Sequence, residues 1–277
     1  MKNTKKKNEN KWKLLDIIIV AAAVCVLAVS GIRLAGIFLE YKAGTDAYGA
    51  LQENYVVHDL ETDGVQDAGV PETEQAGSQE EQVLFPNMLV DFEALREINQ
   101  DLEGWIYIQA LYVEYPLVQG SDNAFYLTHT FEKKENKAGA IFLDSEASAE
   151  LTDYNTFIYG HNMKNGSMFG KLKKFVQDET LCEKDPYFYV FTGEKKYKYL
   201  IISYYVTTDG SETYFRPANE EEFSDYKKLI QNSTSYQCSQ EIPEEAPVVT
   251  LSTCFGAAGG EQRFVVHGVL MTQETGE

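Results

Sequence analysis

The chain has 277 residues, with 43 Asp and Glu against 24 Lys and Arg, and its formal net charge is −19. That length allows one large domain or two small ones with appendages. The acidic balance disfavours nucleic acid as a partner, because phosphate binding needs a basic face. Four cysteines without a Cys-x-x-Cys pair, and only four histidines, argue against a structural zinc site. We therefore expect no metal and no cofactor.

The N-terminus has the pattern of a membrane anchor. Residues 1–13 carry six lysines, and the stretch from Leu14 to Leu39 is uncharged apart from Asp16 and Arg33. A helix of that length, rising about 1.5 Å per residue, more than spans a hydrocarbon core of about 30 Å. Lysine-rich flanks stay in the cytoplasm. We therefore predict a cytoplasmic tail (1–13), a single-pass anchor in the cell membrane (14–39) and an extracellular remainder.

A cleaved signal peptide is the alternative for the same stretch. Ala28-Val29-Ser30 before Gly31 resembles a small-residue cleavage site. Apolar character continues past that site to a spanning length, which favours a retained anchor. Both interpretations place the following domain outside the cytoplasm.

Residues 40–84 are predicted to be an extracellular helix followed by an acidic linker. Tyr41–Val57 has periodic apolar positions suited to a short helix. Asp59–Glu81 contains acids, Gly, Pro and Gln but no Lys or Arg, a composition that cannot bury a core. It predicts a flexible spacer that lifts the domain off the membrane.

Residues 85–277 are expected to form the catalytic domain. Many short strands in one run, without an internal repeat, predict a β-barrel decorated with helices. Pro116 suggests an edge or a bulge in its strand. The expected elements, in chain order, are a helix over Val90–Leu102, strands over Trp105–Gln109 and Tyr112–Val118, a short helix over Asp122–Leu127, strands over Gly139–Leu143 and Asn155–Gly160, a helix over Gly166–Val176, a hairpin of Tyr187–Thr192 and Tyr197–Val206 around Gly193, a helix over Glu220–Ile230, and two final strands.

The stretch VVTLSTCFGAAGGEQRFVVHGVL, residues 248–270, combines a cysteine, a glycine-rich turn and an arginine. Strand alternation places Ser252 and Cys254 on one face, and Arg263 opens the next strand. Glycines between the two strands allow the chain to reverse, so Cys254 and Arg263 are expected near each other. Only a thiolate attacks, and a cation stabilises it, so this is a candidate nucleophile site. A buried, inert core cysteine is the alternative.

His161 is the candidate base. It lies in TFIYGHNM, where a strand gives way to a turn, and is accessible for proton exchange. His58 lies in or next to the spacer and His129 in a loop, so neither has a supporting scaffold. His267 shares a strand face with Arg263 but lies four residues further on, about 13 Å along a strand. It is the serious rival.

With these residues in place, the sequence resembles the sortases, specifically class B, from about Phe85 to Leu270. The joint occurrence of His, Cys and Arg motifs in this order carries the resemblance. Phe255 departs from the acidic residue that follows the cysteine in some class B members. The motifs are YGHNM (Tyr159–Met163), GSMFGKL (Gly166–Leu172), TLSTC (Thr250–Cys254) and RFVV (Arg263–Val266), supported by NQDLEGWI (Asn99–Ile106), YPLV (Tyr115–Val118), DNAFYL (Asp122–Leu127) and GAIFLD (Gly139–Asp144).

The resemblance implies an α+β, mostly β fold: a closed eight-stranded barrel with an N-terminal helix and a helix between the sixth and seventh strands. It also implies a membrane-anchored cysteine transpeptidase of Gram-positive bacteria. Such enzymes cut a sorting signal of a surface protein after Thr and join the Thr carboxyl to an amine of the peptidoglycan precursor or of a pilin. Cys254 would be the nucleophile, His161 the acid/base and Arg263 the oxyanion-binding group.

Substrate contacts are expected from Ser252, which matches the serine of the TLSTC motif, and from the Val206–Glu245 connection. Tyr214 and Phe215 are aromatic candidates there, with a packing role as the alternative. Two other functions stay open at this point: a cell-wall cysteine hydrolase that resolves the thioester with water, and a non-enzymatic binding module. Whether Cys182 and Cys238 form a disulfide is also open.

Overall fold

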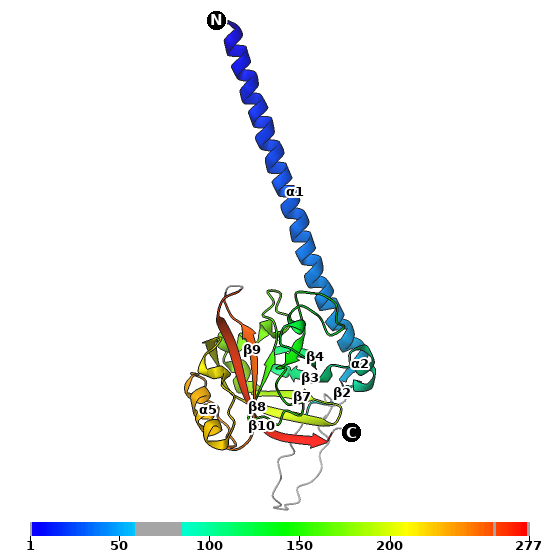
Figure 1. The fold of residues 1–277 in the computed structure, drawn as a ribbon, viewed down its shortest axis with the longest axis vertical. Coiled ribbons are helices and arrows are strands. Elements are labelled where there is room, and N and C mark those ends of the chain that lie inside the picture. The colour runs from blue at the N-terminus through cyan, green and yellow to red at the C-terminus, as the bar shows by residue number, and fades with distance from the viewer. Residues whose placement is uncertain (1, 59–84, 257–258, 276–277) are drawn as a thin grey trace, which may run out of the picture. The chain divides into compact units, whose positions relative to one another are not determined.

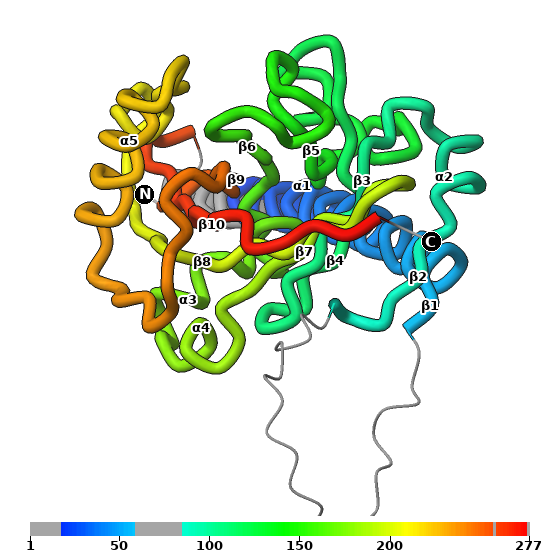
Figure 2. The backbone as a smooth tube through the Cα atoms, turned by 90° about the horizontal axis from the view of Figure 1, so that it is seen from below, coloured from blue at the N-terminus to red at the C-terminus, as the bar shows by residue number. Residues whose placement is uncertain are grey.

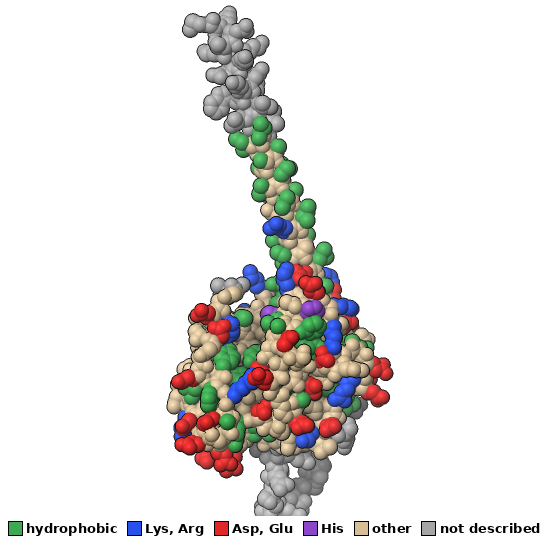
Figure 3. All heavy atoms as spheres, viewed as in Figure 1, with side chains coloured by type: hydrophobic (Ala, Val, Ile, Leu, Met, Phe, Trp, Pro, Cys, Tyr) green, Lys and Arg blue, Asp and Glu red, His purple; other side chains and the backbone are tan. Residues whose placement is uncertain are grey.

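The computed structural model describes the backbone of residues 2–58, 85–256 and 259–275, and the chain divides into two compact units, Met1–Gly44 and Thr45–Glu277. The side chains of residues 2–17 are outside the described part. Helix α1 (Lys2–Tyr55) contributes the first unit and continues into the second. Its side chains between Ile18 and Leu39 are largely apolar and exposed (Figure 3). By length and composition it could cross a membrane.

In the described part of the second unit, eight strands close into a barrel in the order β10-β8-β7-β3-β4-β5-β6-β9 (Figure 1). Neighbours are antiparallel except for β4 with β5 and β6 with β9, which are parallel. This confirms the predicted closed eight-stranded barrel. The strands are β3 (Leu102–Ile108), β4 (Val113–Gln119), β5 (Ile141–Leu143), β6 (Asn155–Tyr159), β7 (Tyr187–Phe191), β8 (Lys195–Thr208), β9 (Val248–Cys254) and β10 (Gln262–Thr275).

A two-stranded sheet follows α1 within the second unit. β1 (Val56–His58) pairs antiparallel with β2 (Met88–Val90). The predicted acidic spacer lies mostly in residues 59–84, outside the described residues. The chain enters and leaves that stretch at one place, because β1 and β2 flank it and pair. The expectation that this spacer lifts the domain off the membrane concerns residues outside the described part and stays a prediction.

Long β-branched and aromatic runs build β8 and β10, which pair along most of their length and lie side by side in Figure 2. The predicted hairpin around Gly193 is confirmed, with Thr192 N–H donating to the Lys195 carbonyl at 2.7 Å. Gly268 sits at a register shift in the β10–β8 pairing. A Cβ there would lie 2.2 Å from Phe188 Cε1, so only glycine lets these strands approach.

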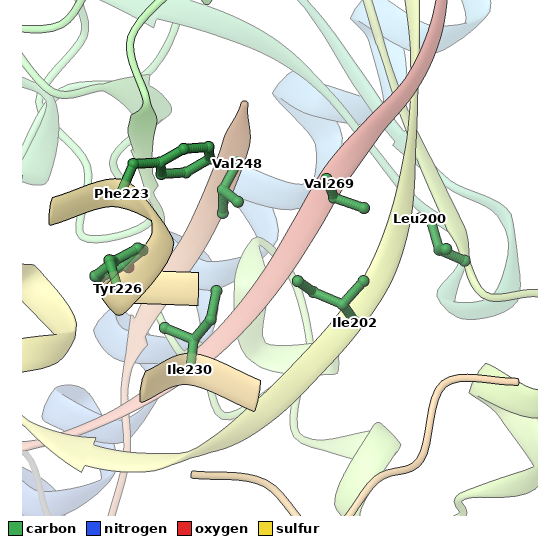
Figure 4. Close-up of a cluster of buried hydrophobic side chains, with 7 residues drawn as sticks. All are labelled: Leu200, Ile202, Phe223, Tyr226, Ile230, Val248 and Val269. Carbon is green, nitrogen blue, oxygen red and sulfur yellow. The ribbon is translucent and has the colours of Figure 1, made fainter. Parts of the chain in front are cut away.

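Helix α5 (Glu220–Asn232) lies between the sixth and seventh barrel strands, as predicted. The Asn219 side chain caps it by accepting from Glu222 N–H at 3.0 Å. Three glutamates in the first turn stabilise the helix, because their negative charges lie at the positive end of its dipole. The acidic side chains of α5 gather at one edge of the face seen in Figure 3. Its apolar face, spaced i, i+3 and i+7, packs on the barrel (Figure 4). The cluster comprises Leu200, Ile202, Phe223, Tyr226, Ile230, Val248 and Val269.

Two predicted helices prove shorter because side chains capture their backbone. The helix expected over Val90–Leu102 is α2 (Phe92–Ile98), which ends where Asn99 is extended and its side-chain oxygen accepts from Asp101 N–H. The Asn99 amide group is buried and donates to Tyr126 and to the Phe131 carbonyl. In the Asp122–Leu127 stretch only the 3-10 helix η2 (Phe125–Leu127) forms. There the Asp122 carboxylate accepts from the N–H groups of Ala124 and Phe125.

The helix expected over Gly166–Val176 is also wrong. Gly166 and Met168 have positive φ, and Met168 forms a bridge with Asn162. These contacts hold the chain out of helical geometry until Phe169. The remaining described helices are the 3-10 helices η1 (Gln109–Leu111), η3 (Phe169–Lys171) and η4 (Glu212–Tyr214), and the α-helices α3 (Lys174–Gln177) and α4 (Thr180–Lys184).

Candidate active site

The parallel pair of β6 and β9 brings two distant motifs to one end of the barrel. Tyr159 pairs with Ser252, and Gly160 N–H donates to the Ser252 carbonyl at 3.2 Å. His161 follows directly, and Cys254 is the last residue of β9. A Cβ on Gly160 would lie 2.4 Å from Ile141 Cδ1, so only glycine fits before the histidine. His161 and Cys254 therefore lie at the same end of the barrel because of the register between β6 and β9.

The antiparallel pair of β9 and β10 adds the arginine. Arg263 lies directly opposite Cys254 in the register, which confirms their predicted proximity. The residues of β9 are buried on both faces up to Thr253, and only Cys254 is exposed. The thiol is accessible to a substrate, in contrast to the inert core cysteine that was the alternative.

A groove of about 470 Å³ joins the three predicted catalytic residues. It also contains Ser252 and Tyr214, two of the three predicted substrate-binding residues. Phe215 lines an adjacent groove with Tyr226 and Leu229 instead. The groove walls are Asn123, Leu127, Phe142, Tyr159, Gly160, His161, Asp209, Gly210, Tyr214, Ser252, Thr253, Cys254 and Arg263.

The imidazole of His161 is held by a main-chain carbonyl. Its Nε2 lies 2.7 Å from the Leu127 oxygen. A carbonyl only accepts, so Nε2 carries the proton and donates it. In the neutral ring, Nδ1 is then the nitrogen that can accept a proton. The contact assigns the tautomer as well as the orientation.

Three acceptors fix the guanidinium of Arg263. Nη2 donates to the Asp209 carboxylate at 2.5 Å, and Nη1 donates to the carbonyls of Gly260 and Gln262 at 2.7 and 3.0 Å. Asp209 comes from the connection between β8 and η4. The ion pair therefore links that connection to the start of β10 and keeps a fixed positive charge in the groove.

Asn162, next to His161, ties the two sides of the site together. Its Nδ2 donates to the Cys254 carbonyl at 2.9 Å, and its Oδ1 accepts from Lys173 Nζ at 3.1 Å. The backbone of the cysteine is thus bonded to the segment that carries the histidine. Phe255 N–H donates to the Gln262 carbonyl at 2.9 Å, which closes the turn into β10.

Tyr214 covers the groove from the β8–α5 connection. Its hydroxyl lies 2.7 Å from Ser252 Oγ, and its ring stacks on Phe157. Burial raises the pKa of Tyr214, so the phenol stays protonated and can share a hydrogen bond with Ser252. Arg216, two residues on, pairs with the buried Asp144 at 2.6 Å. Two polar contacts therefore hold this connection against the barrel.

His267, the rival base, lies inside the barrel. It is fully buried, its Nδ1 lies 2.9 Å from Thr250 Oγ1, and its ring stacks on Tyr205. Burial lowers its pKa to about 3. His267 does not line the groove, and neither do His58 and His129. Of the four histidines, the groove contains His161.

The other cysteines are separate thiols in the structure. Cys182 is buried and Cys238 half-buried, and both are free. Burial raises the pKa of Cys182 to about 12, so this thiol is not ionised near neutral pH. Among the described residues, no group of three His, Cys, Asp or Glu side chains could hold a metal ion.

Sequence reasoning missed several groove residues. Asp209 stands in an Asp-Gly turn. That its carboxylate pairs with Arg263 could not be known without the register of β10. Asn123 and Asn162 both fall within motifs quoted for the resemblance, DNAFYL and YGHNM, but had no assigned role. The Leu127 carbonyl has no sequence signal, because any residue supplies one.

Comparisons with known proteins agree with this geometry. The family model described as the Sortase domain matches residues 106–271. "Sortase B" of Listeria monocytogenes is 34% identical over 183 residues, which cover 65% of this chain and 73% of that protein. The crystal structure of sortase B from B. anthracis in complex with AAEK1 has a TM-score of 0.65 and 30% identity, covering 84% of this chain and 99% of that one. The Staphylococcus aureus sortase B–substrate complex has a TM-score of 0.60 and 26% identity, covering 65% and 84%.

The chain belongs to the sortase family, and within it to class B. It is a sortase transpeptidase enzyme, as the sequence resemblance predicted. Membership of an enzyme family, together with an exposed Cys254 in a groove, favours the enzyme over the non-enzymatic binding module.

We expect His267 to make the barrel sensitive to acid. Its pKa of about 3 lies below the ordinary value of 6.5. Between these two pH values the histidine is protonated in the unfolded chain and neutral in the folded chain. The stability from this neutral ring is complete above pH 6.5 and is lost as pH falls towards 3. Between pH 7 and 5 the loss should be about 2 kcal/mol. Urea unfolding of the full chain in detergent at both pH values measures it.

His267→Gln should remove most of that pH dependence, because the amide does not titrate. His129→Gln, at a half-buried histidine in a loop outside the barrel core, is the matched control and should keep it. Equal pH dependence in wild type and His267→Gln would refute the assignment.

Proposed function

We propose that Cys254 is the nucleophile, His161 the general acid/base and Arg263 the oxyanion-binding group of a sorting-signal transpeptidase. One observation carries the proposal: Cys254 and Arg263 are opposite each other in the β9–β10 register, at a groove that His161 also lines. A thiol, a base and a fixed cation in one groove are what acyl transfer through a thioester needs.

In the first half-reaction, the thiol proton of Cys254 passes to Nδ1 of His161, and the thiolate attacks the carbonyl carbon of the Thr residue in the sorting signal. A C–S bond forms and the carbonyl oxygen takes the negative charge, which Arg263 stabilises. The tetrahedral intermediate then collapses. His161 gives its proton to the leaving amine, the C–N bond breaks, and a thioester remains on Cys254.

In the second half-reaction, an acceptor amine attacks the thioester carbon. His161 takes the proton that the amine loses, and the oxyanion forms again beside Arg263. Collapse breaks the C–S bond, returns the proton to the sulfur and leaves a new amide. Two sequential steps on one enzyme predict ping-pong kinetics.

The bonds of Arg263 are compatible with this role. A guanidinium has five N–H donors. The contacts to Asp209, Gly260 and Gln262 use at most three of them. The donors that remain are available to a substrate carbonyl while the ion pair keeps the group in place.

For substrate binding we propose Ser252, Tyr214 and Phe215. The Ser252–Tyr214 hydrogen bond presents two hydroxyl groups in the groove, next to Cys254. Phe215 is 47% exposed on the adjacent groove, which continues from Gly210 and Tyr214. These positions suit an extended peptide whose polar groups bond near the cysteine and whose side chains lie along the β8–α5 connection.

We propose further that the enzyme is anchored by residues 14–39, with residues 1–13 in the cytoplasm and the barrel at the cell surface. Residues 40–84 would then be the extracellular helix and acidic linker, and 85–277 the catalytic domain. The apolar helix and the lysine-rich N-terminus support this arrangement. The partners would be surface proteins with a sorting signal and an amine of a peptidoglycan precursor or a pilin.

We expect the full chain in detergent to ligate sorting-signal peptides to an amine. A peptide library is incubated with an added amine acceptor, and mass spectrometry identifies products joined at Thr. Cys254→Ala should abolish both cleavage and ligation, because no thioester can form. Cys238→Ala, at a cysteine outside the groove, is the control and should retain both.

Ligation that persists in Cys254→Ala would refute the proposed nucleophile. Products formed by water alone, at all amine concentrations, would instead favour the cysteine hydrolase.

Replacement of Arg263 by Lys should lower kcat/KM about 100-fold, because an ammonium cannot reproduce the planar fork of donors. The same ligation assay measures this change. Arg96→Lys, on α2 and outside the groove, is the matched control and should be unchanged. Near-wild-type activity of Arg263→Lys would contradict the oxyanion role.

The proposed topology predicts different labelling of two exposed cysteines. On intact cells a membrane-impermeant maleimide should label Cys254, at the cell surface, but not Cys25, within the anchor. Two variants are compared, one that keeps only Cys254 and one that keeps only Cys25. Labelling of each variant after solubilisation in detergent is the control that shows the thiol is reactive. Protection of Cys254 on intact cells would overturn the orientation.

A further inference from the structure

The last turns of α1 belong to the barrel unit, which begins at Thr45. Tyr48 and Leu51 are each only 4% exposed. The Tyr48 hydroxyl donates to the Gly139 carbonyl at 2.6 Å and accepts from Phe131 N–H at 3.2 Å. Both partners lie in the segment between η2 and β5, more than 80 residues away in sequence. One buried hydroxyl thus forms hydrogen bonds with two residues of that segment, Phe131 and Gly139.

The same segment holds His161. It follows Leu127, the last residue of η2, whose carbonyl accepts from the imidazole, and near its other end lies Gly139. A Cβ on Gly139 would lie 3.0 Å from His161 Cδ2 and 3.0 Å from the Leu127 oxygen. The glycine that bonds Tyr48 therefore lies beside both the ring and the carbonyl that orients it, with no room for a side chain between them.

A second contact reaches the loop on the other side of the histidine. The Tyr48 ring meets Tyr115 edge-on at 5.3 Å, and the Tyr115 hydroxyl accepts from Met168 N–H at 2.9 Å. Met168 bridges to Asn162, the residue after His161. Tyr48 thus contacts the supports of the histidine from two directions.

We propose that Tyr48, at the end of the long N-terminal helix, is a positioning residue that holds the imidazole of His161 in its working tautomer and orientation. The inference rests on the proposed role of His161 as acid/base. It makes the end of α1 part of the catalytic apparatus, in addition to its place in the anchor helix.

The hydroxyl is the specific element. Burial raises the pKa of Tyr48 far above its ordinary value, so it remains a donor at any pH at which the enzyme folds. Without it, the Phe131 N–H and the Gly139 carbonyl are buried without partners, and the segment must shift to satisfy them. Misplacement of a catalytic group by about 1 Å costs up to about 100-fold in rate. A shift of the Leu127 carbonyl would also release the proton at Nε2 to Nδ1.

Tyr48→Phe tests this, because it keeps the ring against Tyr115 and removes only the oxygen. In the full chain we expect kcat for ligation to fall about tenfold while KM for the peptide changes less than about twofold. Tyr197→Phe is the matched control: Tyr197 is also buried and donates to a carbonyl, that of Glu150, away from the groove. It should retain the wild-type kcat.

The tautomer of His161 gives a readout that does not depend on activity. In protein labelled with ¹⁵N-histidine, the His161 signals are assigned by their loss in His161→Gln, and wild type should show the proton on Nε2. Tyr48→Phe should show a mixture of both tautomers, and Tyr197→Phe the wild-type form. Thermal unfolding confirms that the variants are folded.

An unchanged His161 tautomer together with an unchanged kcat in Tyr48→Phe would overturn the positioning role. If wild type ligates no peptide, the proposed function fails. The NMR comparison still decides whether Tyr48 orients the histidine.

Discussion

The site depends on the parallel pairing of β6 with β9, the contact that closes the barrel between its fourth and seventh strands. Nearly 90 residues of chain separate these strands, and the hydrogen bonds between them fix which residues end together. Strand β6 ends at Tyr159, opposite Ser252, and His161 and Cys254 each follow two residues later on their own strands. Because β10 then pairs back on β9, Arg263 arrives at the same level. A slip of one residue in either pairing would turn these side chains to the opposite face of the sheet.

Around this strand pairing, hydrogen bonds from other parts of the barrel hold four residues of the groove. The Leu127 carbonyl holds His161, Asp209 holds Arg263, Asn162 bonds the backbone of Cys254, and Ser252 bonds Tyr214. The partners come from different connections of the barrel. A site supported in this way needs little rearrangement to meet a substrate, which is the condition under which positioned charges and hydrogen bonds accelerate a reaction.

The end of α1, from Thr45 onward, belongs to the same compact unit as the barrel. Residues from Thr45 pack within the barrel unit, and β1 and β2 pair across the acidic stretch. A helix of the length and composition of a membrane span therefore continues, without a break in its backbone, into a tyrosine that contacts the supports of His161. Shortening the chain at residue 85 would remove this tyrosine together with the proposed anchor.

Sequence by itself determined the family, the closed barrel with α5 between its sixth and seventh strands, the apolar N-terminal helix and the strand facing of Cys254 and Arg263. The apolar helix and the strand facing follow from local periodicity, whereas the family, the closed barrel and the place of α5 are what the resemblance to class B sortases implied. The helices predicted after Val90 and Gly166 were too long. The Asn99 side chain bonds the backbone of Asp101, and a bridge between Met168 and Asn162 holds the chain out of helical geometry. The sequence left the choice between His161 and His267 to a distance argument, which the burial of His267 inside the barrel supports.

Only the tertiary structure decided which groups hold the site residues. These groups are the Leu127 carbonyl, Asp209 and Tyr48, and each acts through a contact between segments far apart in the chain. Such contacts depend on the register of the barrel, and local sequence does not encode that register.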